Sequence, residues 1–120
     1  AHALANRLAS FYPSLVLTTD VNDPAVCDIV VNATPMGAQD DDPVPVDVDR
    51  IAPGAWVGEV VMTPEMTPFL RAAQARGCRV QVGTDMLFEQ IPIYLDYFGF
   101  PTTTPEHLRR LAADGQFSDA

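Results

Sequence analysis

Short runs of apolar, β-branched residues alternate along this chain with longer segments in which apolar residues recur at helical spacing. The short runs predict four strands, at residues 15–19, 29–32, 56–62 and 78–82. The longer segments predict four helices, at residues 3–11, 68–77, 86–98 and from 104 onwards. Strands that alternate with helices indicate an α/β fold in which helices flank a parallel sheet.

Residues with strong positional preferences mark the predicted helix ends. Thr67 followed by Pro68 is typical of an N-cap and of the first helical position. Gly77 suits the residue after the last turn, where the backbone becomes left-handed. Thr84 or Asp85 is expected to cap the third helix. The ends of the second and third helices therefore follow from local side-chain chemistry.

Composition fits one small domain and narrows the class of partner. The chain has 120 residues, a hydrophobic fraction of 48% and a formal net charge of −9. This negative balance argues against nucleic acid and against anionic membrane surfaces. No apolar run approaches the roughly 20 residues that cross a bilayer. The acidic run Asp40–Asp42 favours a solvated loop over a cation site, because no matching ligands stand at metal-site spacing.

The positions of the cysteines and histidines do not indicate a catalytic site or a disulfide framework. Cys27 and Cys78 lie beside or within predicted strands and form no CxxC pattern, so we interpret them as small buried thiols. Two such cysteines fit a reducing cytoplasm. His2 and His107 fall on predicted surface helices without a base or nucleophile nearby. We therefore expect both histidines to be surface residues.

Three sequence blocks carry the candidate chemistry. Residues 28–37 read Asp-Ile-Val-Val-Asn-Ala-Thr-Pro-Met-Gly, a strand that opens into a polar turn. Ligands of open α/β sheets bind beyond such strand ends. Residues 59–69 read Glu-Val-Val-Met-Thr-Pro-Glu-Met-Thr-Pro-Phe, and residues 83–90 read Gly-Thr-Asp-Met-Leu-Phe-Glu-Gln. In motif, order and spacing these blocks resemble those of the shikimate dehydrogenase family.

The resemblance implies a fold and an activity. It implies the last four strands of an incomplete Rossmann-like parallel sheet, so that residues 1–120 are the C-terminal portion of a dinucleotide-binding domain. The implied activity is the NADP- or NAD-dependent reversible reduction of 3-dehydroshikimate, or of a related ring keto acid, to shikimate. The expected partner is a small shikimate-like hydroxy acid, and a homodimer is compatible with the sequence.

The same resemblance implies which residues contact the cofactor. They lie at and just after the end of the second predicted strand, within the third predicted strand, and just before and at the start of the third helix: Asn32, Ala33, Thr34, Val60, Gly83 and Met86. The residues by themselves leave other interpretations open. Asn32 and Thr34 could simply end a strand and cap its turn, and Met86 could be a core residue behind a helix start.

Two residues are implied on the substrate side. Gln90 occupies the position of a glutamine that bonds a substrate hydroxyl in the family, although the sequence alone also allows an exposed or internally satisfied side chain. Met62 stands where the family usually has a tyrosine whose hydroxyl touches the substrate. Loss of that hydroxyl loosens discrimination and makes quinate or another ring hydroxy acid a plausible substrate. The family's usual acidic residue survives as Glu59, while its aspartate before Gly83 is replaced by Val82.

Other parts of the family's site do not occur in this sequence. The Gly-x-Gly-x-x-Gly fingerprint is absent, and the family's catalytic Lys and Asp lie in an earlier domain, so no catalytic residue is assigned. We expect an excerpt of a longer polypeptide, with a gap between strands 15–19 and 29–32 where two central strands belong. A different Rossmann protein with a similar Asn-Ala-Thr loop and a non-enzymatic association domain, inactive alone, remain as alternatives.

Overall fold

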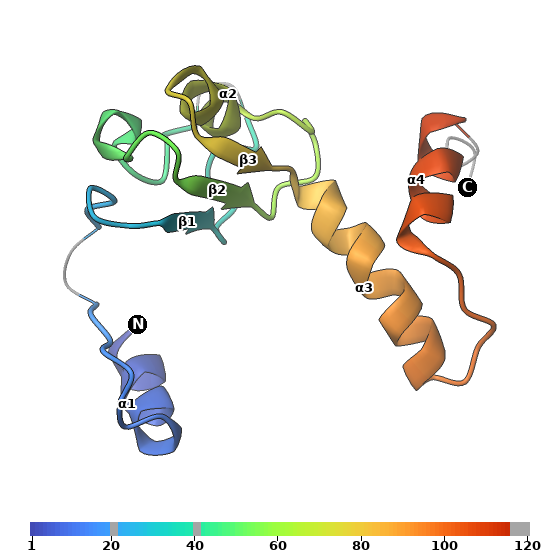
Figure 1. Cartoon of the computed structure of the whole chain (residues 1–120), viewed down its shortest axis with the longest axis horizontal. Helices are drawn as coiled ribbons and strands as arrows, with labels where there is room; N and C mark the ends of the chain where they lie inside the picture. The colour runs from blue at the N-terminus through green and yellow to red at the C-terminus, as the bar shows by residue number, and fades with distance from the viewer. Residues whose placement is uncertain (20–21, 40–41, 116–120) are drawn as a thin grey trace.

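The computed structural model describes residues 1–19, 22–39 and 42–115, and its centre is a small parallel sheet with helices around it (Figure 1). In chain order the elements are α1 (His2–Phe11), β1 (Ile29–Asn32), the 3-10 helix η1 (Val48–Arg50), β2 (Trp56–Glu59), α2 (Pro68–Ala75), β3 (Arg79–Gln81), α3 (Gly83–Tyr97) and α4 (Pro105–Ala113). The predicted α/β class is confirmed. Asp40 and Asp41 of the acidic run lie outside the described residues.

The sheet has the strand order β1-β2-β3, and both pairs are parallel. Ile29 lies opposite Trp56, and Trp56 lies opposite Arg79. At the other end of the strands, Asn32 lies opposite Glu59. The carboxyl ends of all three strands therefore meet at one edge of the sheet, which is the edge where α/β proteins bind ligands.

The first predicted strand is wrong. Residues 15–19 form no strand, so the described part of the chain has a sheet of three strands instead of four. Their composition suits a strand, but a strand exists only where a neighbour accepts its backbone hydrogen bonds. Residues 15–19 do not pair with β1, and Val16 is 88% exposed. The side chain of Thr19 instead bonds the Nδ1 atom of His2 at 2.8 Å.

The core lies between the sheet and the elements η1 and α2. Phe69, Leu70 and Ala73 form the buried stripe of α2 and meet Val57 of β2 and Ile51, which follows η1. The predicted N-cap of α2 is confirmed, because the Thr67 hydroxyl accepts a hydrogen bond from the backbone N–H of Leu70 at 3.2 Å.

Helix α3 leaves the sheet and extends away from it (Figure 1). Its N-cap is Val82, not Thr84 or Asp85, so this prediction was wrong. Gly83 is the first helical residue and the only buried one in α3. A Cβ atom at Gly83 would lie 2.3 Å from the carbonyl oxygen of Val61. This close approach to the backbone of the segment after β2 leaves no room for a side chain at the first residue of α3.

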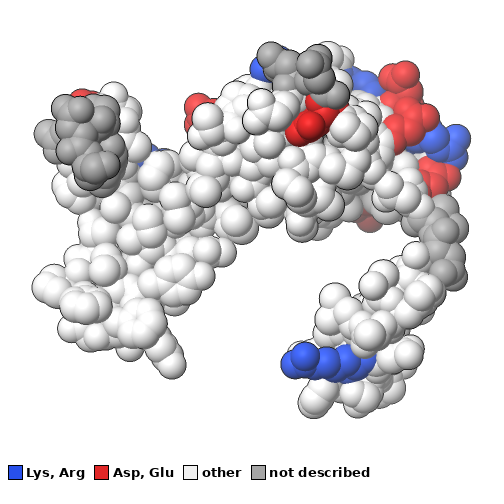
Figure 2. All heavy atoms as spheres, turned by 180° about the vertical axis from the view of Figure 1, so that it is seen from behind, with Lys and Arg blue, Asp and Glu red and all other residues white. Residues whose placement is uncertain are grey.

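Helix α4 packs beside α3 and buries Leu108. Arg109 of α4 forms ion pairs with Asp85 at 3.1 Å and with Glu89 at 2.9 Å, both on α3. Seen from behind, the surface over α3 and the segment after it carries few charged side chains (Figure 2). Among the described residues, no helix has the length and apolar character that crossing a membrane requires.

Candidate functional site

The carboxyl edge of the sheet brings together parts of all three sequence blocks. Asn32 ends β1, Glu59 ends β2, and Gly83 follows β3 after one intervening residue. Because the strands are parallel and in register, these positions share one edge. The candidate site is therefore assembled from segments that are far apart in the sequence.

The side chain of Asn32 is turned inward. It is 2% exposed, and its Nδ2 donates to the carbonyl oxygen of Met36 at 2.8 Å and to Glu59 Oε1 at 2.6 Å. Its Oδ1 accepts from the backbone N–H of Thr34 at 3.1 Å and from the Thr34 hydroxyl at 2.7 Å. These bonds fix the turn that follows β1.

The turn itself is open to the surface. Ala33 and Thr34 are exposed, while Gly37 is buried with a φ of 86°. This left-handed conformation favours glycine and brings the chain back beside Glu59. Ala33 and the outer part of Thr34 are thus the portions of the first block that a ligand at this edge could reach.

Glu59 is the carboxylate at the centre of this edge. It is 4% exposed, and besides the bond from Asn32 it accepts a hydrogen bond on Oε2 from the Thr67 hydroxyl. Buried carboxylates are retained in proteins where hydrogen bonds satisfy them. From the sequence, Glu59 was only the residue left at the family's acidic position. Its contacts could not be predicted because its partners come from two other segments.

Gly83 packs on protein backbone. A Cβ atom there would lie 2.9 Å from the carbonyl carbon of Val60 and closer still to Val61. The close neighbour of Gly83 in the structure is therefore the backbone of the segment after β2. Val60 and Met86 are half-buried near this junction. Contact between these residues and a cofactor stays a prediction.

The two predicted substrate residues are accessible. Met62 is 49% exposed. Gln90 is partly exposed, and its Oε1 accepts a hydrogen bond from the Tyr94 hydroxyl at 3.2 Å. A single long bond between two accessible groups leaves the amide of Gln90 free to rearrange around a ligand. The substrate roles of both residues stay predictions.

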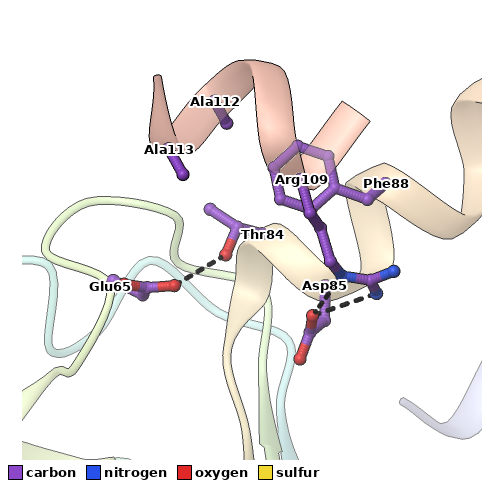
Figure 3. Close-up of a pocket in the computed structure, with 7 residues that line it drawn as sticks. All are labelled: Glu65, Thr84, Asp85, Phe88, Arg109, Ala112 and Ala113. Carbon is purple, nitrogen blue, oxygen red and sulfur yellow. Dashed lines mark hydrogen bonds and ion pairs between the residues drawn. The ribbon is translucent and has the colours of Figure 1, made fainter. Parts of the chain in front are cut away.

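A pocket of about 460 Å³ opens between the segment after β2, α3 and α4 (Figure 3). Its walls include Glu65, Thr84, Asp85, Phe88 and Arg109. Thr84 donates to Glu65 at 3.4 Å, and the guanidinium of Arg109 lies 5.6 Å from the centre of the Phe88 ring. The hydrogen bonds of Arg109 to Glu89 and Asp85 raise its pKa above the usual value. None of the residues predicted to bind cofactor or substrate lines this pocket.

Comparison with known proteins identifies relatives of the chain, although no protein-family model matches it. Shikimate dehydrogenase (NADP(+)) of Paracoccus denitrificans is 45% identical over 82 residues, which cover 68% of this chain and 29% of that protein. Quinate/shikimate dehydrogenase (NAD(+)) of Corynebacterium glutamicum strain R is 44% identical over 66 residues, covering 55% of this chain and 23% of that protein.

Solved structures give the same picture. Shikimate 5-dehydrogenase of Thermus thermophilus, in complex with NADP(H) and shikimate, matches 92% of this chain and 41% of that one with a TM-score of 0.72 and 25% identity. Quinate dehydrogenase of Corynebacterium glutamicum, in complex with NAD, matches 75% of this chain and 32% of that one with a TM-score of 0.63 and 34% identity.

The fold is Rossmann-like, and the solved structures that it resembles are dehydrogenases. Within that class it is related to the shikimate and quinate dehydrogenases, as the three sequence blocks indicated. The chain spans about three tenths of the length of the first curated relatives that it matches.

Proposed function

We propose that this chain is the C-terminal part of the dinucleotide-binding domain of an NADP- or NAD-dependent oxidoreductase. The complete enzyme would reversibly reduce 3-dehydroshikimate, or a related ring keto acid, to shikimate or its analogue in the cytoplasm. The observation that carries the proposal is the meeting of all three motif blocks at the carboxyl edge of a parallel sheet. The free thiols of Cys27 and Cys78 are consistent with a reducing compartment.

The chain would supply one wall of the cofactor site. The wall consists of the loop after β1, the segment after β2 and the start of α3: Asn32, Ala33, Thr34, Val60, Gly83 and Met86. The exposed Ala33 and Thr34 are uncharged, and the one carboxylate at the centre of this edge, Glu59, is buried. Such a surface offers no cation to a phosphate and fits the nicotinamide end of the cofactor better. When bound, the cofactor supplies the hydride, and this chain's residues orient it.

Gln90 and Met62 would face the substrate. The amide of Gln90 can bond a ring hydroxyl, whereas Met62 offers only apolar contact. A site without a hydroxyl partner at position 62 discriminates less between shikimate and its analogues. The named activity of the relatives from Corynebacterium, which covers both quinate and shikimate, supports a relaxed choice of substrate for this chain.

The test is an assay of the full-length polypeptide that contains this chain. Reduction of NADP or NAD is followed with shikimate and with quinate, and turnover with at least one combination is expected. Absence of turnover with all four combinations would overturn the proposal. The isolated 120-residue chain is expected to show none, because it lacks the Gly-rich loop and any Lys–Asp pair assigned to catalysis.

The substrate choice is tested by Met62→Tyr in the same full-length protein. The new hydroxyl is expected to raise the ratio of kcat/KM for shikimate over quinate, because it restores a hydrogen bond to one substrate. An unchanged ratio would show that Met62 does not face the substrate.

A further inference from the structure

We infer that Glu59 is a positioning residue for the cofactor site, and that Asn32 acts on the cofactor only through the loop that Glu59 holds. The inference rests on the proposed function, because it concerns how the same site is kept in shape. On this inference the Asn32 side chain does not contact the cofactor itself. It holds the loop in which Ala33 and Thr34 are exposed.

The hydrogen-bonding capacity of Asn32 is fully used within the chain. A side-chain amide has two N–H donors and two acceptor lone pairs. The donors of Asn32 are used by the Met36 carbonyl and by Glu59, and both acceptor positions are used by Thr34. The partners also fix which atom is nitrogen, because a carbonyl and a carboxylate can only accept. The Asn32 side chain therefore keeps no polar group for a ligand.

Glu59 connects two segments that shape the edge of the sheet. One carboxylate oxygen accepts a hydrogen bond from the amide of Asn32 at the end of β1. The other accepts a hydrogen bond from the hydroxyl of Thr67 at the start of α2. A Cβ atom at Gly37 would lie 3.7 Å from Glu59 Oε1, so the far end of the loop also rests against this carboxylate. A single side chain on β2 thus joins the loop after β1 to the N-terminus of α2.

Burying this carboxylate is costly. A carboxylate that is 4% exposed has lost most of its hydration, and other groups must replace the water. An apolar side chain at position 59 would avoid that cost but would leave the Asn32 amide and the Thr67 hydroxyl without an acceptor. The geometry points to the shape of the loop, and not to charge at a reacting atom, as the purpose of Glu59.

The experiment measures the Kd of the full-length protein for NADP and for NAD by fluorescence titration. The variants are Asn32→Ala, Glu59→Ala, the double variant, Glu59→Gln and Glu59→Asp. Asn22→Ala and Glu106→Ala serve as matched controls, because Asn22 bonds the carbonyl of Pro45 at the surface and Glu106 lies on α4. Both controls are expected to bind as the wild type does.

Each alanine variant is expected to weaken cofactor binding by about tenfold, and the double variant should be no weaker than either one, because both remove the same support. Gln at position 59 keeps an oxygen for Asn32 and can donate to Thr67, so it should stay within about threefold of the wild type. Asp keeps the charge but is too short to reach both partners, so it should resemble Ala. If Glu59→Ala fails to fold, Glu59→Asp replaces it in the cycle.

Two results would overturn the inference alone. The effects of Asn32→Ala and Glu59→Ala could multiply to about a hundredfold, which would mean that Asn32 contacts the cofactor independently. Alternatively, Glu59→Gln could bind as poorly as Glu59→Ala while Glu59→Asp binds normally, which would assign the effect to charge. If the wild type binds neither cofactor, the proposed function itself fails and the inference fails with it.

Discussion

Two regions of this chain use their apolar residues in different ways. The sheet unit, which comprises β1, β2, β3, η1 and α2, buries Ile51, Val57 and Phe69 completely. The arm, which comprises α3 and α4, buries only Gly83 and Leu108. The large apolar side chains of its outer half stay exposed: Ile93, Tyr94, Tyr97 and Phe98.

The difference shows that an apolar pattern predicts a helix face but not what covers it. Ile93, Tyr94, Tyr97 and Phe98 even line a shallow hollow on the arm. The four side chains are of the kind found in protein cores, but they are exposed to solvent. In the sheet unit, by contrast, the sheet and α2 supply both sides of the core from within the chain. Apolar substitutions should therefore have unequal effects in the two regions.

The largest effect is expected from Phe69→Ala. Phe69 is fully buried between α2 and the sheet, and removing a buried phenylalanine side chain costs about 3–5 kcal/mol of the free energy of unfolding. Urea unfolding followed by the fluorescence of Trp56 measures this loss.

The matched control is Phe98→Ala in the arm, where the side chain is 67% exposed. The same substitution should change the free energy of unfolding by about 0.5 kcal/mol or less. Equal losses for the two variants would abolish the distinction between the sheet unit and the arm.

The joint between the two regions should be the next most sensitive place. Gly83→Ala would press a methyl group into the backbone of Val60 and Val61, and such overpacking costs about 1–3 kcal/mol. Gly58→Ala is the control, because its Cβ would meet Val31 at an ordinary 3.7 Å. Thermal unfolding of both variants measures the difference. A Gly83 variant as stable as the Gly58 variant would show that the start of α3 shifts without cost.

A smaller effect, on binding instead of stability, is expected in the arm. In the full-length enzyme, Gln90→Ala should weaken substrate binding by about 0.5–1.5 kcal/mol, the usual value of one hydrogen bond to a neutral group. Steady-state kinetics with each accepted substrate measure it, and Tyr94→Phe, which removes only the partner of Gln90, serves as the control. Unchanged constants for Gln90→Ala would make this glutamine a structural residue.

The smallest effect concerns an exposed pair beside the sheet unit. The hydrogen bonds from Arg50, at 2.6 and 2.9 Å, hold the pKa of Asp23 below its usual value. A carboxylate with a lowered pKa in the folded state stabilises the fold above its unfolded pKa, and this contribution is lost as the pH falls through the folded pKa. Asp23→Asn should therefore slightly flatten the acid limb of a plot of unfolding free energy against pH. An acid limb identical to that of the wild type would show that the pair contributes nothing.

Local chemistry made part of the structure predictable. The predicted N-cap Thr67 acts through its own side chain on the next turn, so sequence was sufficient for it. The predicted helix start at residue 104 has the same local cause, because the Thr104 hydroxyl accepts from the backbone N–H of His107. The strand Ile29–Asn32 was also predicted with its observed limits. The strand predicted at residues 15–19 does not form, because a β-forming composition cannot supply a pairing partner.

The candidate site was predictable only in part for a related reason. The motif blocks identified the loop after β1 and the position of Gly83, since both lie within short sequence stretches. The network around Glu59 depends on parallel register, which sets Asn32 beside it, and on the return of the chain to Thr67. No local pattern encodes such a meeting of three segments.

The parallel register of the sheet also has a kinetic consequence. Ile29 must find Trp56, and Trp56 must find Arg79, before either ladder can begin. Each encounter closes a long loop and sacrifices chain entropy before any strand hydrogen bond forms. Helix α2, whose bonds are local, can form within microseconds or less. Assembly of the sheet, and with it of the edge that carries the candidate site, is therefore expected to be slower than the formation of α2.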